Sequence, residues 1–188
     1  MRRNAAVAVL VFGALGGAAC AAALLMGPRL DGAAAPPPKP VWTEMPWPFP
    51  IDQWGGGKAF RCKPEHCGAE VKLYLRAKIG FCDCVSAIDD DEVDRVADFD
   101  LLGGDRAALG AGQPVDVHWM QGRSRAYALS AGATPPRSAL AVAFHDRCDM
   151  MVATAVIGGE QPAAQEAAVL AFLNSDTVLH WAEVAVGL

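Results

Sequence analysis

The sequence predicts an α+β protein with an N-terminal membrane helix, followed by one domain with a mostly antiparallel sheet of about six or seven strands and two main helices. Three observations lead to this class. The first 30 residues contain a long uncharged run, residues 69–79 alternate strictly between apolar and polar side chains, and several apolar strand patterns lie between two helical patterns. Strands that follow one another through short turns favour an antiparallel sheet over alternating parallel units.

The uncharged run covers residues 5–26, which are 22 consecutive positions after Arg2 and Arg3. A cleaved signal peptide has an apolar core of about 7–15 residues, whereas about 20 apolar residues span a bilayer. Residues 1–30 are therefore interpreted as a signal anchor or a signal peptide, and the length favours the anchor. The weak apolarity of Ala and Gly leaves cleavage open, and a lipid-modified Cys20 is a third interpretation.

The charges that flank this run predict on which side of the membrane the domain lies. Arg2 and Arg3 precede the run, whereas a single arginine offset by an aspartate follows it. Positively charged flanks stay in the cytoplasm. We therefore expect a single-pass inner-membrane protein with its C-terminal domain in the periplasm, or a protein secreted to the periplasm after signal cleavage. The candidate partners are the inner membrane, through the N-terminal helix, and an envelope protein.

Residues 31–40, DGAAAPPPKP, form a Pro/Ala-rich linker, because such a stretch adopts an extended polyproline-like form and acts as a spacer. The remaining 148 residues, 41–188, have the size of a single extracytoplasmic globular domain. They contain 12 Lys and Arg against 20 Asp and Glu, a net charge of -8. Nucleic-acid binding requires a basic face, so this charge excludes nucleic acid as a general partner.

A β-hairpin is predicted near the start of the domain. Residues 69–79, AEVKLYLRAKI, are apolar at every odd position and polar or amphipathic at every even one, which is the period of a strand with one dry and one wet face. The preceding KAFRCK reads as its partner strand, and Pro64 and Gly68 mark the turn. The wet face, turned to solvent or to a partner, would carry Glu70, Lys72, Tyr74, Arg76 and Lys78.

An acidic helix is predicted next, in SAIDDDEVDRVADFDLL. Ser86 followed by Asp89 resembles a capping box, and acidic side chains are favourable at a helix N-terminus. The calcium-loop pattern fails because Val93 stands at a ligand position and no glycine follows. The acidic residues of 83–105 and the basic residues of 58–78 are expected to attract one another within the fold. The apolar side of the helix would consist of Val93, Val96, Ala97 and Leu101.

Four more strands are predicted, at residues 114–120, 124–129, 139–144 and 150–157. The first two are joined at Gln121 and Gly122, which form a turn signal. The last two are apolar on both faces, which predicts central strands covered on both sides. QPAAQEAAVLAFLN then reads as a helix with Pro162 in its first turn, and DTVLHWAEVAVGL is ambiguous between helix and strand.

Aromatic residues are concentrated before the hairpin. Trp42, Trp47, Phe49 and Trp54 lie among three prolines in VWTEMPWPFPIDQW. A proline-rich stretch cannot form an inner strand. We therefore expect an extended segment that lies across the domain, with its aromatic side chains capping the core. A docking site for a partner or for lipid headgroups is the alternative.

Five cysteines of the domain are disulfide candidates, because thiols outside the cytoplasm are normally oxidised. Cys62 and Cys67 flank the four-residue loop of the hairpin and are expected to bond each other. Cys82 and Cys84 would lie at the far end of the long strand, and one of them is placed to reach Cys148. A shared zinc site is disfavoured because the strand separates the two cysteine pairs by about 33 Å. No metal site is expected.

No set of acid, base and nucleophile is visible in the sequence. The four histidines are widely spread. Arg123 and Arg125 share a strand face with Tyr127, so they are candidates for an anion-binding surface, with an ordinary solvated face as the alternative. We expect a membrane-anchored domain that binds or scaffolds in the cell envelope without catalysis or cofactor. The alternative is a thiol- or metal-handling accessory protein that uses the cysteine-rich segment 62–84.

Two segments, WPFPIDQWGGGKAFRCK and RAKIGFCDC, resemble parts of uncharacterised exported and membrane-anchored proteins of GC-rich proteobacteria. The resemblance covers the region of residues 47–84. It implies an exported bacterial protein and carries no activity with it.

Overall fold

The computed structural model describes residues 39–80, 87–103, 105–129, 135–159 and 162–187, all within the unit Pro38–Leu188. The predicted membrane helix, most of the predicted linker, Cys82 and Cys84 lie outside the described residues. Within these ranges, no helix has both the length and the apolarity needed to span a membrane.

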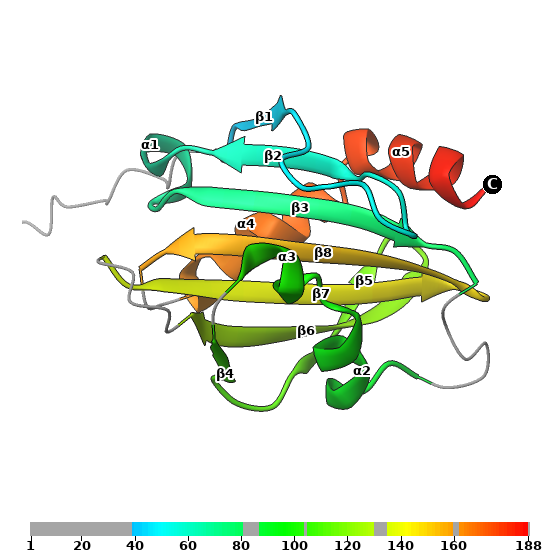
Figure 1. The fold of residues 1–188 in the computed structure, drawn as a ribbon. Coiled ribbons are helices and arrows are strands. Elements are labelled where there is room, and N and C mark those ends of the chain that lie inside the picture. The colour runs from blue at the N-terminus through cyan, green and yellow to red at the C-terminus, as the bar shows by residue number, and fades with distance from the viewer. Residues whose placement is uncertain (1–38, 81–86, 104, 130–134, 160–161, 188) are drawn as a thin grey trace, which may run out of the picture. The chain divides into compact units, whose positions relative to one another are not determined.

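The described part is α+β, as predicted (Figure 1). Its strands are β1 Trp42–Met45, β2 Lys58–Cys62, β3 Val71–Lys78, β4 Arg106–Ala108, β5 Gln113–Val117, β6 Met120–Leu129, β7 Arg137–Asp146 and β8 Asp149–Gly158. Its helices are α1 Pro64–Cys67, α2 Asp90–Val96, α3 Phe99–Leu102, α4 Ala163–Leu173 and α5 Asp176–Val186. The strands form one sheet in the order β1-β2-β3-β8-β7-β6-β4, with β5 also paired to β6. Every pair of neighbouring strands is antiparallel.

The predicted numbers of elements were too low. The described residues form 8 strands and 5 helices, where about six or seven strands and two main helices were expected. The additional elements include β1, β4, α1 and α3, which have only 3 or 4 residues each. Such elements are too short for a hydrophobic period to reveal them.

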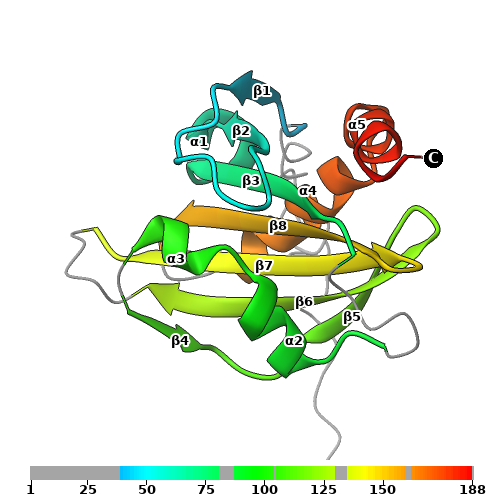
Figure 2. The same cartoon turned by 45° about the vertical axis from the view of Figure 1, so that its right-hand side comes forward.

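Helices cover both faces of the sheet (Figures 1 and 2). The face against α4 and α5, here called the α4/α5 face, carries the larger group of buried side chains, among them Leu73, Phe144 and Leu173. On the opposite α2/α3 face, Val93 and Phe99 pack against β6, β7 and β8. The middle of the sheet is therefore buried on both sides.

β7 and β8 are central strands, as their continuous apolar sequences predicted. Leu140 and Val142 of β7 belong to the buried group on the α4/α5 face, whereas Ala141 and Ala143 belong to the group on the α2/α3 face. All four side chains are buried. A strand that is covered on both faces has no reason to alternate between apolar and polar residues.

The predicted hairpin is confirmed as β2 and β3, with Cys62 opposite Val71. The connection contains the single helical turn α1, with Pro64 in its first turn and Gly68 at its end, where φ is 73°. Glycine adopts this left-handed conformation without strain. The predicted disulfide between Cys62 and Cys67 is present, with their Cα atoms 6.0 Å apart.

The prediction that the even-numbered side chains of β3 face solvent or a partner is wrong for its central part. Tyr74, Arg76 and Lys78 are only 8%, 2% and 6% exposed. The segment of residues 46–57 covers Tyr74, and Asp98, between α2 and α3, binds both Arg76 and Lys78. Alternation showed that these residues share a face, but polarity alone did not show that charged partners would cover that face.

The aromatic segment before the hairpin lies across the domain, as predicted. Trp42 of β1 stacks on Phe172 of α4, with ring centroids 4.6 Å apart. Trp47 and Phe49 pack against Tyr74 on the other face, at 6.2 and 4.8 Å. β1 occupies an edge of the sheet, where a strand next to prolines needs only one neighbour.

α2 begins three residues later than the capping box at Ser86 predicted. Asp89 is the N-cap residue, and its carboxylate accepts a hydrogen bond of 2.8 Å from the Glu92 N–H. Ser86 itself lies outside the described residues. The apolar side was predicted correctly where it faces the sheet, since Val93 is fully buried. The interpretation of the acidic run as helix capping is therefore confirmed at a shifted position.

The turn between β5 and β6 also differs from the prediction. It consists of His118 and Trp119, with φ of 53° at His118, and does not involve Gln121 and Gly122. Gly122 lies inside β6, where a Cβ atom would collide with the Ala143 carbonyl of β7. This glycine allows two strands to approach each other closely. In the sequence alone, such a glycine cannot be told from one that marks a turn.

The two C-terminal helices lie on the α4/α5 face. Pro162 directly precedes α4, as its fixed φ suggested. The ambiguous last stretch is helix α5, which buries Val178 and Ala182 against the sheet. The spacing of four residues between these two explains why a helix buries them together.

Candidate functional site

A pocket of about 270 Å³ opens on the α2/α3 face at one end of the sheet; we call it the end pocket. Its floor comes from β3, β6, β7 and β8, and its walls come from α3 and from the segment of residues 46–57. Its lining consists of Phe49, Glu70, Lys72, Tyr74, Leu101, Leu102, Gly103, Leu129, Arg137, Val156 and Gly158.

The strand register explains why these residues meet. Arg137 begins β7 and lies opposite both Gly158, at the end of β8, and Leu129, at the end of β6. Lys72 lies opposite Val156 on the other side of β8. Side chains two residues apart in a strand share a face, so these four strands contribute neighbouring residues to one floor.

Gly158 leaves a gap in this floor. A Cβ atom there would meet only backbone atoms of Glu70, at 3.7 and 3.9 Å, which is ordinary contact distance. Its backbone is not in the left-handed region. The position therefore accepts a side chain without strain, and a large one would fill space that the pocket now provides.

The walls of the pocket are apolar. Leu101 and Leu102 belong to α3, and Phe49 packs edge-on against Tyr74 with ring centroids 4.8 Å apart. Leu129 adds a further aliphatic side chain from β6. A ligand in this pocket would contact apolar side chains at its sides and polar groups at the floor. Small-molecule sites commonly combine these two kinds of contact.

The polar groups of the end pocket are mostly donors. Glu70 is engaged by Arg61 at 2.8 Å and by Lys72 at 4.0 Å. Among the described residues, Arg137 has no ion pair, and the Tyr74 hydroxyl has no hydrogen-bond partner. Burial raises the pKa of Tyr74, the charge of Glu70 raises it further, and Arg137 opposes this by lowering it. The hydroxyl therefore keeps its proton at neutral pH and remains available as a donor.

A second group of charges, further along β3, is internally satisfied. The Arg76 guanidinium donates to both Asp98 oxygens, at 3.1 and 2.6 Å, and to both Asp52 oxygens at 2.9 Å. Lys78 donates to the Val96 carbonyl at 2.7 Å and lies 3.1 Å from Asp98. Burial lowers the pKa of Arg76, but Asp98 and Asp52 outweigh it and raise the pKa overall. These contacts fasten the segment 46–57 and the α2–α3 connection to the sheet.

No family model matches the chain, and no curated protein matches its sequence. The functional conclusion therefore depends on which groups the fold leaves available for a ligand. In the end pocket, these are the donors of Arg137 and Tyr74.

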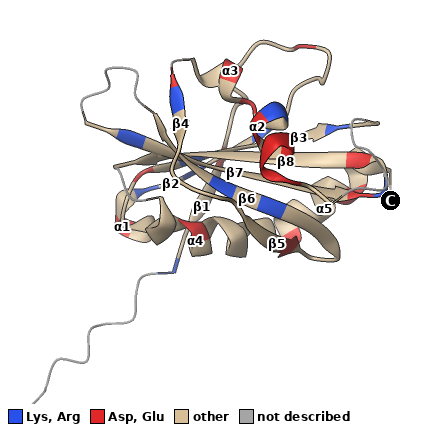
Figure 3. Cartoon of the chain, turned by 90° about the horizontal axis from the view of Figure 1, so that it is seen from below, with Lys and Arg blue, Asp and Glu red and all other residues tan. Residues whose placement is uncertain are grey.

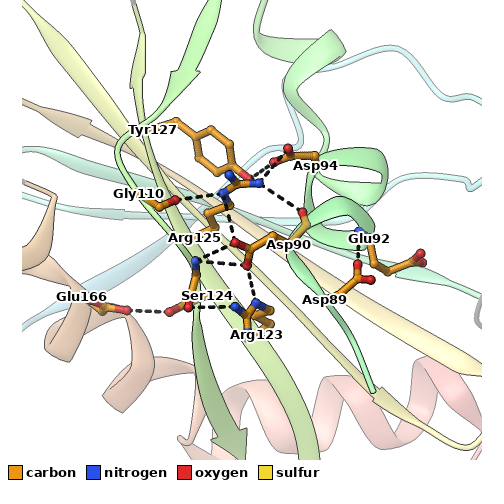
Figure 4. Close-up of polar contacts among 11 residues, drawn as sticks. Asp89, Asp90, Glu92, Asp94, Gly110, Arg123, Ser124, Arg125, Tyr127 and Glu166 are labelled. Carbon is orange, nitrogen blue, oxygen red and sulfur yellow. Dashed lines mark hydrogen bonds and ion pairs between the residues drawn. The ribbon is translucent and has the colours of Figure 1, made fainter. Parts of the chain in front are cut away.

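Basic residues of β6 lie beside the acidic helix α2 (Figure 3), and the predicted anion-binding residues Arg123 and Arg125 contact carboxylates of that helix (Figure 4). Arg123 binds Asp90 through its Nε, and Arg125 donates to Asp94 at 2.8 Å. The Tyr127 hydroxyl donates to Asp94 at 2.5 Å. Burial raises the pKa of Tyr127, and Asp94 raises it further. An external anion at Arg123 or Arg125 would have to displace the carboxylates of α2.

The predicted disulfide residues are resolved in part. Cys62 and Cys67 are bonded to each other, and Cys148 is also in a disulfide. Cys82 and Cys84 lie outside the described residues. No group of three or more His, Cys, Asp or Glu side chains placed to hold a metal ion occurs within the described ranges.

Sequence reasoning missed the end pocket. It placed Lys72 and Tyr74 on a strand face turned to solvent or to a partner, without a pocket, and it did not single out Arg137. The only sequence signal at Arg137 was a cation two residues before the apolar run of residues 139–144. Because the pocket joins four strands, α3 and Phe49, its composition depends on pairings that no local pattern specifies.

Proposed function

We propose that the chain is a membrane-anchored periplasmic protein whose folded domain binds a small ligand without catalysis, and that the end pocket is the binding site. One observation carries this proposal. Tyr74 and the solvent-exposed Arg137, whose polar groups have no partner among the described residues, line a pocket with apolar walls. Donors left available beside apolar walls are the features by which a pocket recognises and orients a ligand.

The chemistry of the lining favours binding over catalysis. General acid–base catalysis works best with a group whose pKa lies near the operating pH. Here the pKa of Tyr74 is raised above its ordinary value of 10.0, so the phenol stays protonated. The Glu70 carboxylate is held by Arg61. The lining therefore suits holding a ligand better than moving protons.

The proposed location rests on the sequence. The uncharged residues 5–26 behind Arg2 and Arg3 provide the anchor, and residues 31–40 provide a spacer. A binding domain on such a tether would sample ligands close to the membrane surface.

The end pocket can be tested without knowing the ligand. Full-length protein in lipid nanodiscs would be screened by saturation-transfer NMR against a mixed library of small acids, alcohols and amines, beside the variant Gly158→Leu. We expect some compounds to bind the wild type and to lose their signal with Gly158→Leu. Gly158→Ala, which adds only one methyl group, should keep most of the binding.

The thermal midpoints of the three proteins must agree for this comparison, because the leucine is meant to fill the pocket and not to unfold the domain. Compounds that bind equally well to wild type and Gly158→Leu would contradict the assignment of the site. Absence of binding by every compound would contradict the proposed function.

A further inference from the structure

We propose, resting on the binding function proposed above, that the ligand of the end pocket is a small organic acid with one negative charge: a carboxylate attached to an apolar body about the size of one aromatic ring or a short acyl chain. The carboxylate would be bound by Arg137 and the Tyr74 hydroxyl, and the apolar body would lie against Phe49, Leu101 and Leu102.

The sign and number of charges come from the lining. Lys72 and Arg137 contribute two positive charges and Glu70 contributes one negative charge, so the lining has a net charge of about +1. A monoanion compensates this charge, whereas a dianion, such as inorganic phosphate at about pH 8, would leave excess negative charge beside Glu70.

The donors favour a carboxylate in particular. The planar guanidinium of Arg137 can donate two parallel hydrogen bonds to a carboxylate. The hydroxyl of Tyr74 can donate a third, and its raised pKa ensures that it carries the proton. Arg137 and Tyr74 both line the end pocket. The two donors can therefore converge on one anionic group.

The size and walls limit the apolar body. A cavity of about 150 Å³ holds benzene. The end pocket, at about 270 Å³, therefore has room for one ring together with a carboxylate. Phe49, Leu101, Leu102 and Leu129 offer only hydrocarbon to such a body. Acetate would leave these apolar side chains exposed to water, so it should bind more weakly than an acid with a ring.

The test is isothermal titration, at about pH 8 where inorganic phosphate is mainly the dianion, of full-length protein in neutral-lipid nanodiscs with four probes: phenylacetate, benzyl alcohol, acetate and inorganic phosphate. Phenylacetate should bind tightest, and each of the others should be at least about tenfold weaker, because a charged hydrogen bond or a buried ring is worth about 1.5 kcal/mol or more. Compared with phenylacetate, benzyl alcohol lacks the negative charge and acetate lacks the apolar ring. Phosphate tests whether a second negative charge is tolerated.

Three variants separate the contributions. Arg137→Gln should weaken phenylacetate about tenfold and leave benzyl alcohol unchanged. Leu102→Ala should weaken both aromatic probes by a similar factor. Arg147→Gln is the matched control, because it removes an arginine that is largely exposed in the turn after β7, away from the pocket lining, and it should change nothing.

The outcomes distinguish this inference from the proposed function. If benzyl alcohol binds as tightly as phenylacetate and Gly158→Leu abolishes both, the pocket is a binding site but the ligand is not an anion. If phosphate binds as tightly as phenylacetate and Leu102→Ala has no effect, the ligand does not need the proposed apolar body. If no probe binds and the screen against Gly158→Leu is also negative, the binding function itself fails.

Discussion

At the scale of single residues, the charges of β3 show how polar side chains can be buried. The side chains of Arg76, Lys78 and Asp98 are 3%, 7% and 8% exposed. Two cations share one buried carboxylate, with Asp52 as a second, more exposed partner of Arg76. Such a group contributes little net stability compared with apolar packing, but removal of one member leaves a buried charge uncompensated.

Asp98→Asn tests this arrangement. The variant keeps the shape of the side chain but leaves two buried cations without their shared carboxylate, so we expect a loss of about 3–5 kcal/mol in the free energy of unfolding. Urea unfolding monitored by circular dichroism measures the loss. Asp100→Asn is the matched control, because Asp100 is exposed and makes no ion pair with the described residues. Equal urea midpoints for the two variants would contradict the interpretation.

At the scale of elements, Asp90 and Asp94 attach α2 to β6, and Asp90 also binds the loop before β5. The Asp90 carboxylate accepts from the Arg123 side chain and from the Gly112 N–H at 3.0 Å, and Arg125 lies close by. The hydrogen bond from Arg123, followed by that from Gly112, lowers the pKa of Asp90 below its ordinary value of 3.8. A lowered pKa means that the folded state favours the charged carboxylate.

This lowered pKa predicts acid sensitivity with a defined sign. The stabilisation by Asp90 is fully present above pH 3.8, its ordinary pKa, and is lost as the pH falls below that value towards the pKa of the folded state. Asp90→Asn should therefore lower the thermal midpoint at pH 7 and flatten its fall between about pH 5 and pH 2. Asp91→Asn, one residue along the same helix, should keep the wild-type slope. Thermal melts in a pH series measure both, and identical slopes in Asp90→Asn and wild type would exclude Asp90 as the sensitive group.

The elements also show what could be predicted from the sequence. Long periodic segments such as β3, and long apolar ones such as β7 and β8, were identified because their patterns extend over many residues. The turn predicted at Gly122 was wrong because glycine occurs both in tight turns and at close contacts between strands. Only the position of the neighbouring strand distinguishes the two cases. The predicted start of α2 was three residues too early because several acidic residues in a row offer more than one capping position.

At the scale of the whole described unit, the two faces of the sheet differ in how predictable they were. The α4/α5 face is covered by helices that follow the sheet in sequence and carry apolar side chains. The α2/α3 face is covered by short helices and by residues 46–57, through rings and ion pairs that connect distant parts of the chain. The end pocket forms between these covering segments, so a local pattern could not reveal it.

Export of the chain is the prediction at this scale. Alkaline phosphatase fused after Leu188 should be active in cells, because the two arginines before the uncharged run predict that the N-terminus lies in the cytoplasm. The same fusion without residues 5–26 is the control and should be inactive. Activity of a reporter that works only in the cytoplasm, at the same junction, would reverse the predicted orientation.

The pairing of β3 with β8 has a consequence for the order of folding. It joins Val71 to Ile157 and Lys78 to Met150, so the β2–β3 hairpin cannot complete its sheet until nearly the whole chain has been made. Contacts between such distant segments form slowly. If the chain crosses the membrane as proposed, the edge of β3 that pairs with β8 stays unpaired until β8 has been made. Its charged residues Lys72, Arg76 and Lys78, the last two of which pair with Asp98 in the finished fold, would keep that unpaired edge soluble and oppose aggregation during export.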